Sequence, residues 1–229
     1  MPPSTVIVFG ATSAGGLELC RRLRGDQVRV VAGVRAGSNR SNLEALGVEC
    51  READALEPEQ LLNAMRALGE QPTVVSLLGG MPNKKSSVVD SQGNINVIDA
   101  ATAAEVRRFV LVTSVGCNES YKALVWFPRI IILRHTIREK SKAETYLKNS
   151  GLAWTIIRPG RLTALRRRPS GRGILIEHPL AAGPITRVDL GELVYRTVSS
   201  EQAIGKTYTA ADQRHAKILG GVAVLPAQV

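Results

Sequence analysis

The residues best suited to chemistry form a run of small side chains near the start of the chain: Gly10, Ala11, Thr12, Ser13, Ala14, Gly15 and Gly16. This run follows an apolar stretch, Val6–Phe9, and precedes helical spacing from Leu17 to Arg24. A helix start carries free N–H groups and the positive end of the helix dipole, and both favour a bound anion. Small residues are needed because a larger side chain would keep a phosphate away from the backbone. A glycine turn alone is common to many strand–helix units, but in this position it predicts a dinucleotide site.

The end of the next predicted strand, Val28–Val34, indicates which dinucleotide the site would take. A site for NAD has an acidic residue about 20 residues beyond the glycines, which accepts from the ribose hydroxyls. Here Arg35 ends the strand, and Ser38 and Arg40 follow it. A guanidinium pairs with a 2′-phosphate in a fork geometry, whereas a carboxylate would repel it. The sequence therefore predicts NADP(H) bound through Arg35 and Arg40, and the alternative is that Arg35 is a solvated strand-end residue.

Two polar residues farther along have side chains suited to a reduction. Ser114 follows the predicted strand Arg108–Val112, and its hydroxyl would bind a substrate carbonyl or a carboxamide. Lys140 has an ammonium group that would hold ribose hydroxyls. Hydride transfer asks little of a protein beyond holding a nicotinamide against an electrophilic atom. The alternatives are that Ser114 only ends its strand and that Lys140 lies on a solvated helix face. No Ser-His-Asp set, carboxylate pair or metal-ligand spacing is present.

The elements that must position these residues alternate along the chain. Strands are predicted at 6–9, 28–34, 48–52, 73–78, 108–112, 154–158 and 174–176. Helices are predicted at 17–24, 42–46, 58–68, 91–104, 137–150 and 190–198, the last capped by Asp189. This alternation predicts an α/β protein with a doubly wound parallel sheet, a Rossmann fold, and a small C-terminal substrate lobe. Ligands of such sheets bind beyond the carboxyl ends of the strands, so Gly10, Arg35, Asp54, Leu78, Gly79 and Ser114 should meet around one crevice.

Composition limits the class of protein further. The 229 residues suit one domain, and a hydrophobic fraction of 44% with 4% aromatics predicts an aliphatic core. We find no linker or repeat and predict a single domain over residues 1–229, with 118–135 and 159–188 as candidate substrate-side insertions. The three cysteines have no metal-ligand spacing, and we find neither a secretory signal nor a membrane span. The expectation is a cytoplasmic protein with reduced thiols and no metal.

The formal charge of +10 suits nucleic acid, an anionic membrane surface or an acidic small molecule. No nucleic-acid motif accompanies the basic residues, so we expect no nucleic-acid partner. The apolar stretch Trp126–Pro128 and the basic loop Arg166–Arg172 would form a lid over a flat, apolar, anionic substrate such as a flavin or bilin. Ile130–Leu133 is alternatively core or a partner interface, so a protein partner at residues 121–135 remains open.

Taken together, the motifs resemble those of the atypical short-chain dehydrogenase/reductases over about residues 4 to 210. More narrowly, they are similar to the small NAD(P)H-binding group that includes flavin and biliverdin-IXβ reductases and nitrogen-metabolite-repressor-like proteins. The residues that carry the resemblance are the turn 10–16, Asp54, Thr113-Ser114, Lys142–Leu147, Ser150–Gly160 and Thr186–Leu190.

This resemblance implies contacts for a bound cofactor. Asp54 and Ala55 would contact the adenine, Leu78 and Gly79 would run beneath the cofactor, and Pro159 and Arg161 would lie near the nicotinamide. The simpler interpretation of Asp54 is a helix or turn cap.

The chain departs from the family pattern in three places. It has Ser13 where glycine is usual, Thr136 where the catalytic tyrosine would stand, and Gly160 where some biliverdin-IXβ-type reductases have histidine. The serine hydroxyl would itself donate to a phosphate.

The sequence thus predicts an NADPH-dependent oxidoreductase that reduces a conjugated small molecule, with a flavin or a tetrapyrrole as candidates. The missing tyrosine motivates an alternative, a non-catalytic NADP(H)-binding regulator or assembly factor that acts through protein partners.

Overall fold

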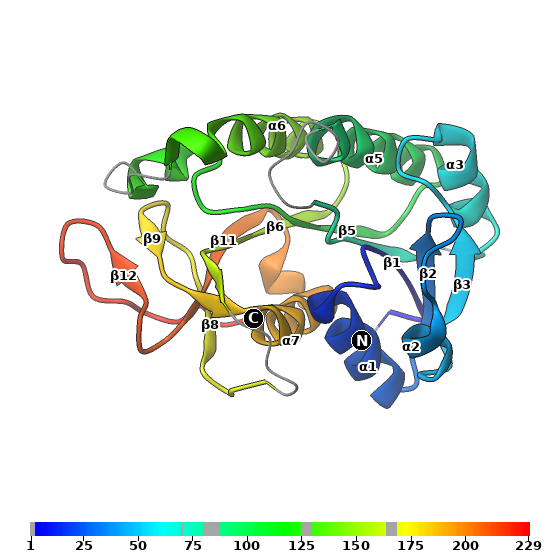
Figure 1. Cartoon of the computed structure of the whole chain (residues 1–229), viewed down its shortest axis with the longest axis horizontal. Coiled ribbons are helices and arrows are strands. Elements are labelled where there is room, and N and C mark those ends of the chain that lie inside the picture. The colour runs from blue at the N-terminus through cyan, green and yellow to red at the C-terminus, as the bar shows by residue number, and fades with distance from the viewer. Residues whose placement is uncertain (1–2, 70, 80–87, 125–129, 164–168) are drawn as a thin grey trace.

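The computed structural model describes residues 3–69, 71–79, 88–124, 130–163 and 169–229, arranged around one large sheet (Figure 1). In the described ranges the spatial order of its strands is β3-β2-β1-β4-β5-β6-β11-β8. Neighbouring strands are parallel, except that β8 runs antiparallel to β11. The bounds are β1 Thr5–Phe9, β2 Arg29–Val34, β3 Glu49–Glu52, β4 Thr73–Ser76, β5 Arg108–Val112, β6 Trp154–Pro159, β8 Gly173–Ile176 and β11 Lys206–Asp212.

Helices cover both faces of the sheet. One face carries α1 (Ala14–Gly25), α2 (Ser41–Glu44) and α7 (Arg187–Val198), and the other carries α3 (Pro58–Arg66), α5 (Asn94–Ala103) and α6 (Ile130–Lys148) (Figure 1). Shorter helical turns are the π-helical η1 (Val89–Gly93) and the 3₁₀ turns η2 (Asn118–Leu124) and η3 (Glu201–Ala203). The predicted doubly wound α/β fold is therefore confirmed. None of the helices in the described ranges is long and apolar enough to cross a membrane.

Strand β1 shows how the apolar sequence builds the core. Val6 and Val8 belong to the hydrophobic cluster under α1 and α7, whereas Ile7 and Phe9 belong to the cluster under α3, α5 and α6. Successive side chains of a strand point to opposite faces, so a strand buried on both faces must be apolar throughout. This is why Val6–Phe9 has no polar position.

A small lobe follows β6 at the C-terminal end of the chain. Here β7 (Leu162–Thr163) pairs with β10 (Ile185–Thr186), and β9 (Ala181–Ala182) pairs with β12 (Lys217–Ile218). The tail returns to the main sheet, where the Ala227 N–H donates to the Leu175 carbonyl of edge strand β8 at 2.7 Å. The predicted C-terminal lobe is present, and its role on the substrate side stays a prediction.

Three sequence expectations in this part of the chain are corrected. Helix α6 begins at Ile130 rather than at Ile137. The sequence did not predict this start, because a short apolar run such as Ile130–Leu133 does not show by itself whether it is helical. Helix α7 is capped by Thr186, whose hydroxyl accepts from the Asp189 N–H, and not by Asp189. Strand β12 is not among the strands predicted from the sequence. The proposed lid residues Trp126–Pro128 and Arg166–Arg168 lie outside the described residues.

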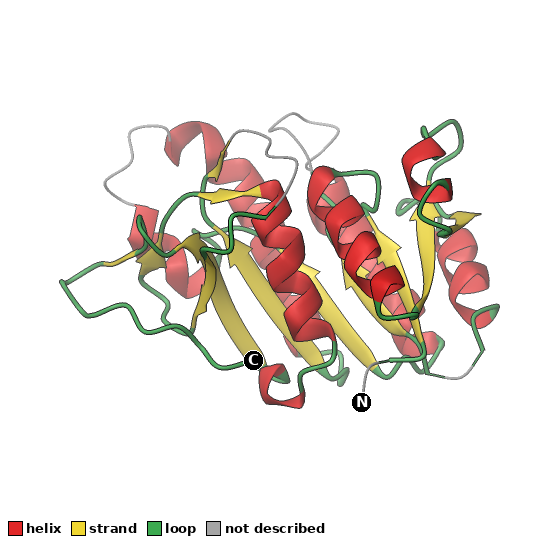
Figure 2. Cartoon of the chain, turned by 90° about the horizontal axis from the view of Figure 1, so that it is seen from below, coloured by secondary structure: helices red, strands yellow, loops and turns green. Residues whose placement is uncertain are grey.

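Helices α1 and α7 lie side by side against the sheet and approach each other closely through glycine (Figure 2). A Cβ atom on Gly191 would lie 2.3 Å from the Gly15 carbonyl oxygen, and one on Gly15 would lie 2.9 Å from the Arg187 carbonyl oxygen. Both obstacles are backbone atoms, which cannot rotate away as a side chain does. Glycine at these positions therefore sets the separation of the two helices.

We expect Gly191→Ala to destabilise the fold by roughly 1–3 kcal/mol, because the added methyl must push α7 away from α1. Gly25→Ala, at the other end of α1, is the matched control, since a Cβ there would meet no atom within 4 Å. Urea unfolding of both variants measures the difference. Equal stability of the two variants would contradict the proposed close packing.

Candidate functional site

The ends of strands β1 to β4 surround a cleft of about 450 Å³ at the carboxyl edge of the sheet. Its walls include eight residues predicted from the sequence: Gly10, Thr12, Ser13, Arg35, Asp54, Ala55, Leu78 and Gly79. They also include Ala11 and Ser38, which were named in the predicted turn and loop. Six further wall residues were not singled out from the sequence: Phe9, Gly33, Val34, Ala53, Leu77 and Val89. A crevice is therefore present around the first four strands, but Ser114, which was expected to border it, is not on its wall.

The floor of the cleft is the turn between β1 and α1. Gly10 has φ +81°, a conformation that favours glycine, and a Cβ there would lie 2.7 Å from the Leu77 carbonyl oxygen. The Ser13 N–H donates to the Gly10 carbonyl at 3.1 Å and closes the turn. A Cβ on Gly16 would lie 2.4 Å from that same carbonyl oxygen. The tight turn leaves backbone and small side chains at the cleft, as a phosphate requires.

Ser13, Ala14 and Gly15 have distinct roles in the first turn of α1. The Ser13 hydroxyl oxygen accepts from the Gly16 N–H at 3.0 Å, which makes it the N-cap, and its own proton remains free to donate. Ala14 is half-buried and is not on the cleft wall. Gly15 is buried against α7, so its small size serves helix packing. The N-terminus of α1 nevertheless faces the cleft through Thr12 and Ser13.

Charge along the described cleft wall comes from Arg35 and Asp54. Arg35 is exposed at the end of β2, and Ser38 lies on the same wall. The Arg35 guanidinium has no ion-pair partner among the described residues, so it remains available to an anionic ligand. Arg40 is half-buried at the start of α2 and is not on the wall.

Asp54 caps a turn and also lines the cleft, while its predicted contact with adenine stays a prediction. Its Oδ1 accepts from the Leu56 N–H at 2.9 Å, which caps the turn after β3, while the residue also lines the cleft. The backbone of the neighbouring Ala55 is held by Asn96, whose side-chain amide donates to the Ala55 carbonyl at 2.9 Å. This part of the wall is thus fixed by hydrogen bonds within the protein.

Ser114, Pro159 and Arg161 follow β5 and β6, farther along the same sheet edge. The Val115 N–H donates to the Pro159 carbonyl at 2.9 Å, which joins the two strand ends. The Ser114 hydroxyl donates to the Val115 carbonyl at 3.0 Å, and Arg161 is exposed. These residues are not on the wall of the cleft itself. They border the region beyond Leu78 and Gly79, where the reactive end of a dinucleotide would lie.

Lys140 lies behind the cleft wall rather than on a solvated helix face. Its Nζ is 2.9 Å from Oδ1 of Asp90, and both side chains are almost completely buried. A Cβ on Gly79 would lie 2.4 Å from Lys140 Nζ and 2.8 Å from Asp90 Oδ1. Lys140 therefore occupies the space that a side chain at position 79 would need.

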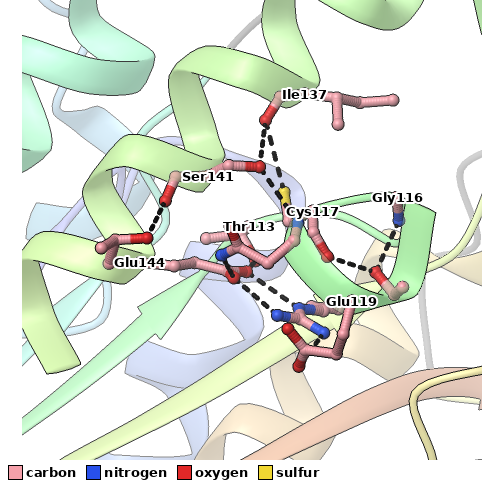
Figure 3. A network of polar contacts seen from close by, with 11 residues as sticks. Thr113, Gly116, Cys117, Glu119, Ile137, Ser141 and Glu144 are labelled. Atoms are coloured by element: carbon pink, nitrogen blue, oxygen red, sulfur yellow. Dashed lines mark hydrogen bonds and ion pairs between the residues drawn. The ribbon is translucent and has the colours of Figure 1, made fainter.

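A buried network of polar contacts joins α6 to the end of β5 and to β6 (Figure 3). Its centre is the fully buried Glu144, which lies one helical turn after Lys140. Arg158 of β6 donates to both carboxylate oxygens, at 3.0 and 2.7 Å. Thr113 and Asn118 donate to the same carboxylate at 2.6 and 2.7 Å.

The same network reaches the segment that follows β5. Arg158 Nη1 donates to Glu119 at 2.8 Å, and burial of Glu119 is outweighed by this bond, so the pKa of its carboxyl is lowered. The Ser120 hydroxyl accepts from the Gly116 N–H at 2.9 Å and donates to the Cys117 carbonyl at 2.7 Å. Thr113 is the residue just before Ser114, so the network also fixes where Ser114 lies.

Sequence reasoning missed Asp90, Glu144 and Arg158. Glu144 and Arg158 lie in stretches that were assigned to a helix and a strand, and Asp90 lies one residue before the predicted helix 91–104. The available signal was a charged residue at an otherwise apolar position of its element. No three His, Cys, Asp or Glu residues in the described ranges are arranged to hold a metal ion.

We expect Arg158→Met to destabilise the fold by about 3–5 kcal/mol, because it leaves the Glu144 carboxylate buried without its main partner. The double variant Arg158→Met/Glu144→Leu should recover much of that loss, since no buried charge remains. The matched control is Arg107→Met, which removes an exposed guanidinium 3.9 Å from Glu201. Urea unfolding measures the free energy of unfolding of each variant. A double variant less stable than Arg158→Met would contradict this account.

The chain is 29% identical to the protein TIC 62 of Oryza sativa subsp. japonica over 82% of its own length, and it spans only 42% of that relative. Among solved structures, ChuY, an anaerobilin reductase of Escherichia coli O157:H7, has a TM-score of 0.79 and 26% identity over 91% of this chain and 97% of its own. A putative NAD-dependent epimerase/dehydratase of Bacillus halodurans has a TM-score of 0.76 and 26% identity over 91% of this chain and 94% of its own.

The model of the NAD(P)H-binding family matches residues 10–201, a range that begins at the glycine turn and contains every residue of the cleft wall except Phe9. The cleft fits a dinucleotide because its floor has room only for backbone and small side chains. The chain belongs to the NAD(P)H-binding family.

Proposed function

We propose that this protein is an NADPH-dependent oxidoreductase that reduces a conjugated small molecule, with a flavin or a tetrapyrrole as candidate substrates. The observation that carries the proposal is the cleft itself, with the β1–α1 turn as its floor and the unpaired Arg35 on its wall. A bound nicotinamide cofactor would supply the hydride. The chain's residues hold and orient the two reactants.

The choice of NADPH over NADH rests on the charges at the end of β2. A 2′-phosphate placed near the ribose would meet the Arg35 guanidinium and Ser38, and no carboxylate of the described wall lies at this strand end. Charge-assisted hydrogen bonds of this kind are worth about 1.5–3 kcal/mol each. Arg40, the residue just before α2, is a second cation in the loop that follows β2.

The substrate class is supported by the likeness to ChuY, an anaerobilin reductase, which matches nearly the whole chain. A flat conjugated acceptor needs no strong acid beside the atom that receives the hydride, because the electron pair that arrives with the hydride is spread over several atoms. Such a reaction is compatible with Thr136 standing where the family tyrosine would stand.

A non-catalytic NADP(H)-binding regulator or assembly factor is the second candidate. It is favoured by the positions of the four tyrosines, all of them described. None lies on the cleft wall, and Tyr146 and Tyr195 donate instead to Asp99 and Asp26 on the protein surface. In that case the cofactor would control a protein contact, for which residues 121–135 are the proposed surface.

The cofactor preference has a direct test in measured dissociation constants. We expect NADPH to bind at least about tenfold more tightly than NADH, and Arg35→Ala to remove most of that difference, a change of about 1.4 kcal/mol or more. Arg29→Ala is the matched control, because Arg29 lies at the opposite end of β2 and pairs with Glu49. Equal binding of the two cofactors by the native chain would overturn the preference.

Turnover separates the two candidate functions. We expect NADPH oxidation with flavin, bilin or quinone acceptors, and a loss of this activity in Thr12→Glu, whose carboxylate would repel the pyrophosphate at the exposed turn. Thr12→Gln has a similar size without the charge and should keep NADPH binding within about threefold, under 0.7 kcal/mol. Tight NADPH binding without turnover on the whole panel would favour the regulator instead.

A further inference from the structure

A small hollow lies at the amino ends of β4 and β5, on the edge of the sheet opposite the cleft. Its volume is about 60 Å³, and none of the proposed cofactor contacts involves it. A space of this size holds more than one water molecule, or one small ion. Its walls come from four separate parts of the chain: Pro3, Thr73, Arg107 and Arg108, and Val198, Ser199, Ser200, Glu201 and Ile204.

Arg108, which lines this hollow, is buried and only partly hydrogen-bonded. The residue is 5% exposed. Its Nη2 donates to the Thr155 hydroxyl at 2.7 Å and to the Thr197 carbonyl at 3.0 Å. Nε and Nη1, which carry the other three N–H groups of the guanidinium, have no hydrogen-bond partner among the described residues. A buried donor without an acceptor costs free energy, so these N–H groups favour an acceptor from outside the chain.

The charges around the hollow favour an anion. Burial lowers the pKa of the Arg108 guanidinium to about 10, so it keeps its positive charge at neutral pH. Arg107 adds to the lowering, whereas Tyr208 and Glu201 oppose it. Arg107 Nη2 lies 3.9 Å from Glu201 Oε1, and both of these side chains are exposed to solvent, which weakens their pairing. Two arginines and one glutamate are the charged residues of the described walls, which therefore have a net positive charge.

Hydroxyl residues add further donors to the same walls. Thr73 begins β4, and Ser199 and Ser200 follow α7. The hydroxyls of these three residues make no hydrogen bond within the ranges that the structure describes. A hydroxyl can donate to an oxyanion, and a guanidinium recognises phosphate oxygens through charge-assisted hydrogen bonds. Arginines and free hydroxyls around a small space are therefore a suitable donor set for phosphate.

We propose that this hollow binds inorganic phosphate, with Arg108 as its main ligand. Arg107 and the Ser199 hydroxyl are further donors on its exposed side. The site is separate from the cofactor cleft, and the proposal does not depend on the reductase function. Because its walls combine the start of β5 with the end of α7, the site exists only in the folded chain. Phosphate that binds there therefore stabilises the fold.

Titration calorimetry with inorganic phosphate in a zwitterionic buffer tests the site. The chain is first saturated with NADPH, so that anion-binding groups of the cleft are already occupied. We expect one phosphate to bind per chain under these conditions. Phosphate that binds only in the absence of NADPH would lie in the cleft and would overturn the proposal. No phosphate binding at all would also overturn it.

Two variants at exposed Ser199 locate the binding without altering Arg108. Ser199→Asp adds a carboxylate to the wall and should raise the Kd for phosphate at least about tenfold by repulsion. Ser199→Asn has a similar size without the charge and should keep the Kd within about threefold. Arg108→Lys keeps a positive charge but lacks the planar fork, so it should also raise the Kd at least about tenfold. An unchanged Kd in Ser199→Asp or in Arg108→Lys would overturn the proposal.

Thermal unfolding of the NADPH-saturated chain gives a second readout. Phosphate should raise the Tm of the native chain and of Ser199→Asn, and it should raise the Tm of Ser199→Asp much less. Potassium chloride at the same ionic strength is the control, because salt screens the repulsion within a chain of formal charge +10. An equal rise of Tm in chloride and phosphate would indicate screening alone and would overturn the proposal.

Discussion

The buried fork between Glu144 and Arg158 determines how the two halves of the sheet edge are assembled. Glu144 lies on α6, Arg158 on β6 and Thr113 at the end of β5, so one carboxylate fixes the position of a helix relative to two strands. Such a pair adds little net stability over apolar residues of the same size, because both groups lose their hydration. It does impose one arrangement, since every donor around the carboxylate has to be in place.

That arrangement has a direct effect on the cleft. Lys140 precedes Glu144 by one helical turn and so shares its face of α6. A rotation of α6 large enough to move Lys140 away from Asp90 would also break the Glu144 contacts. The ion pair beside the cleft is therefore set by a second ion pair that lies deeper in the protein, and both belong to one helix.

The cleft of the first four strands could be predicted well from the sequence, and its surroundings could not. Gly10, Arg35, Asp54 and Gly79 follow predicted strands, and the carboxyl ends of parallel strands must meet at one edge. Asp90 and Lys140 are far apart in the sequence, and an isolated charge on a helix has the same pattern whether it is solvated or paired. Gly15 illustrates a different limit, because a small residue serves phosphate approach and helix packing equally well, and here it packs against α7.

The contact between α1 and α7 has a consequence for how the chain folds. Helix α1, which follows the glycine turn, is synthesised well before residues 187–198, and these form the surface it packs on. Until that segment leaves the ribosome, the apolar face of α1 and of β1 has no cover. A pairing this distant in sequence also slows folding, because a long loop must close before the contact forms. The packing of α1 is therefore completed only once α7 has been made.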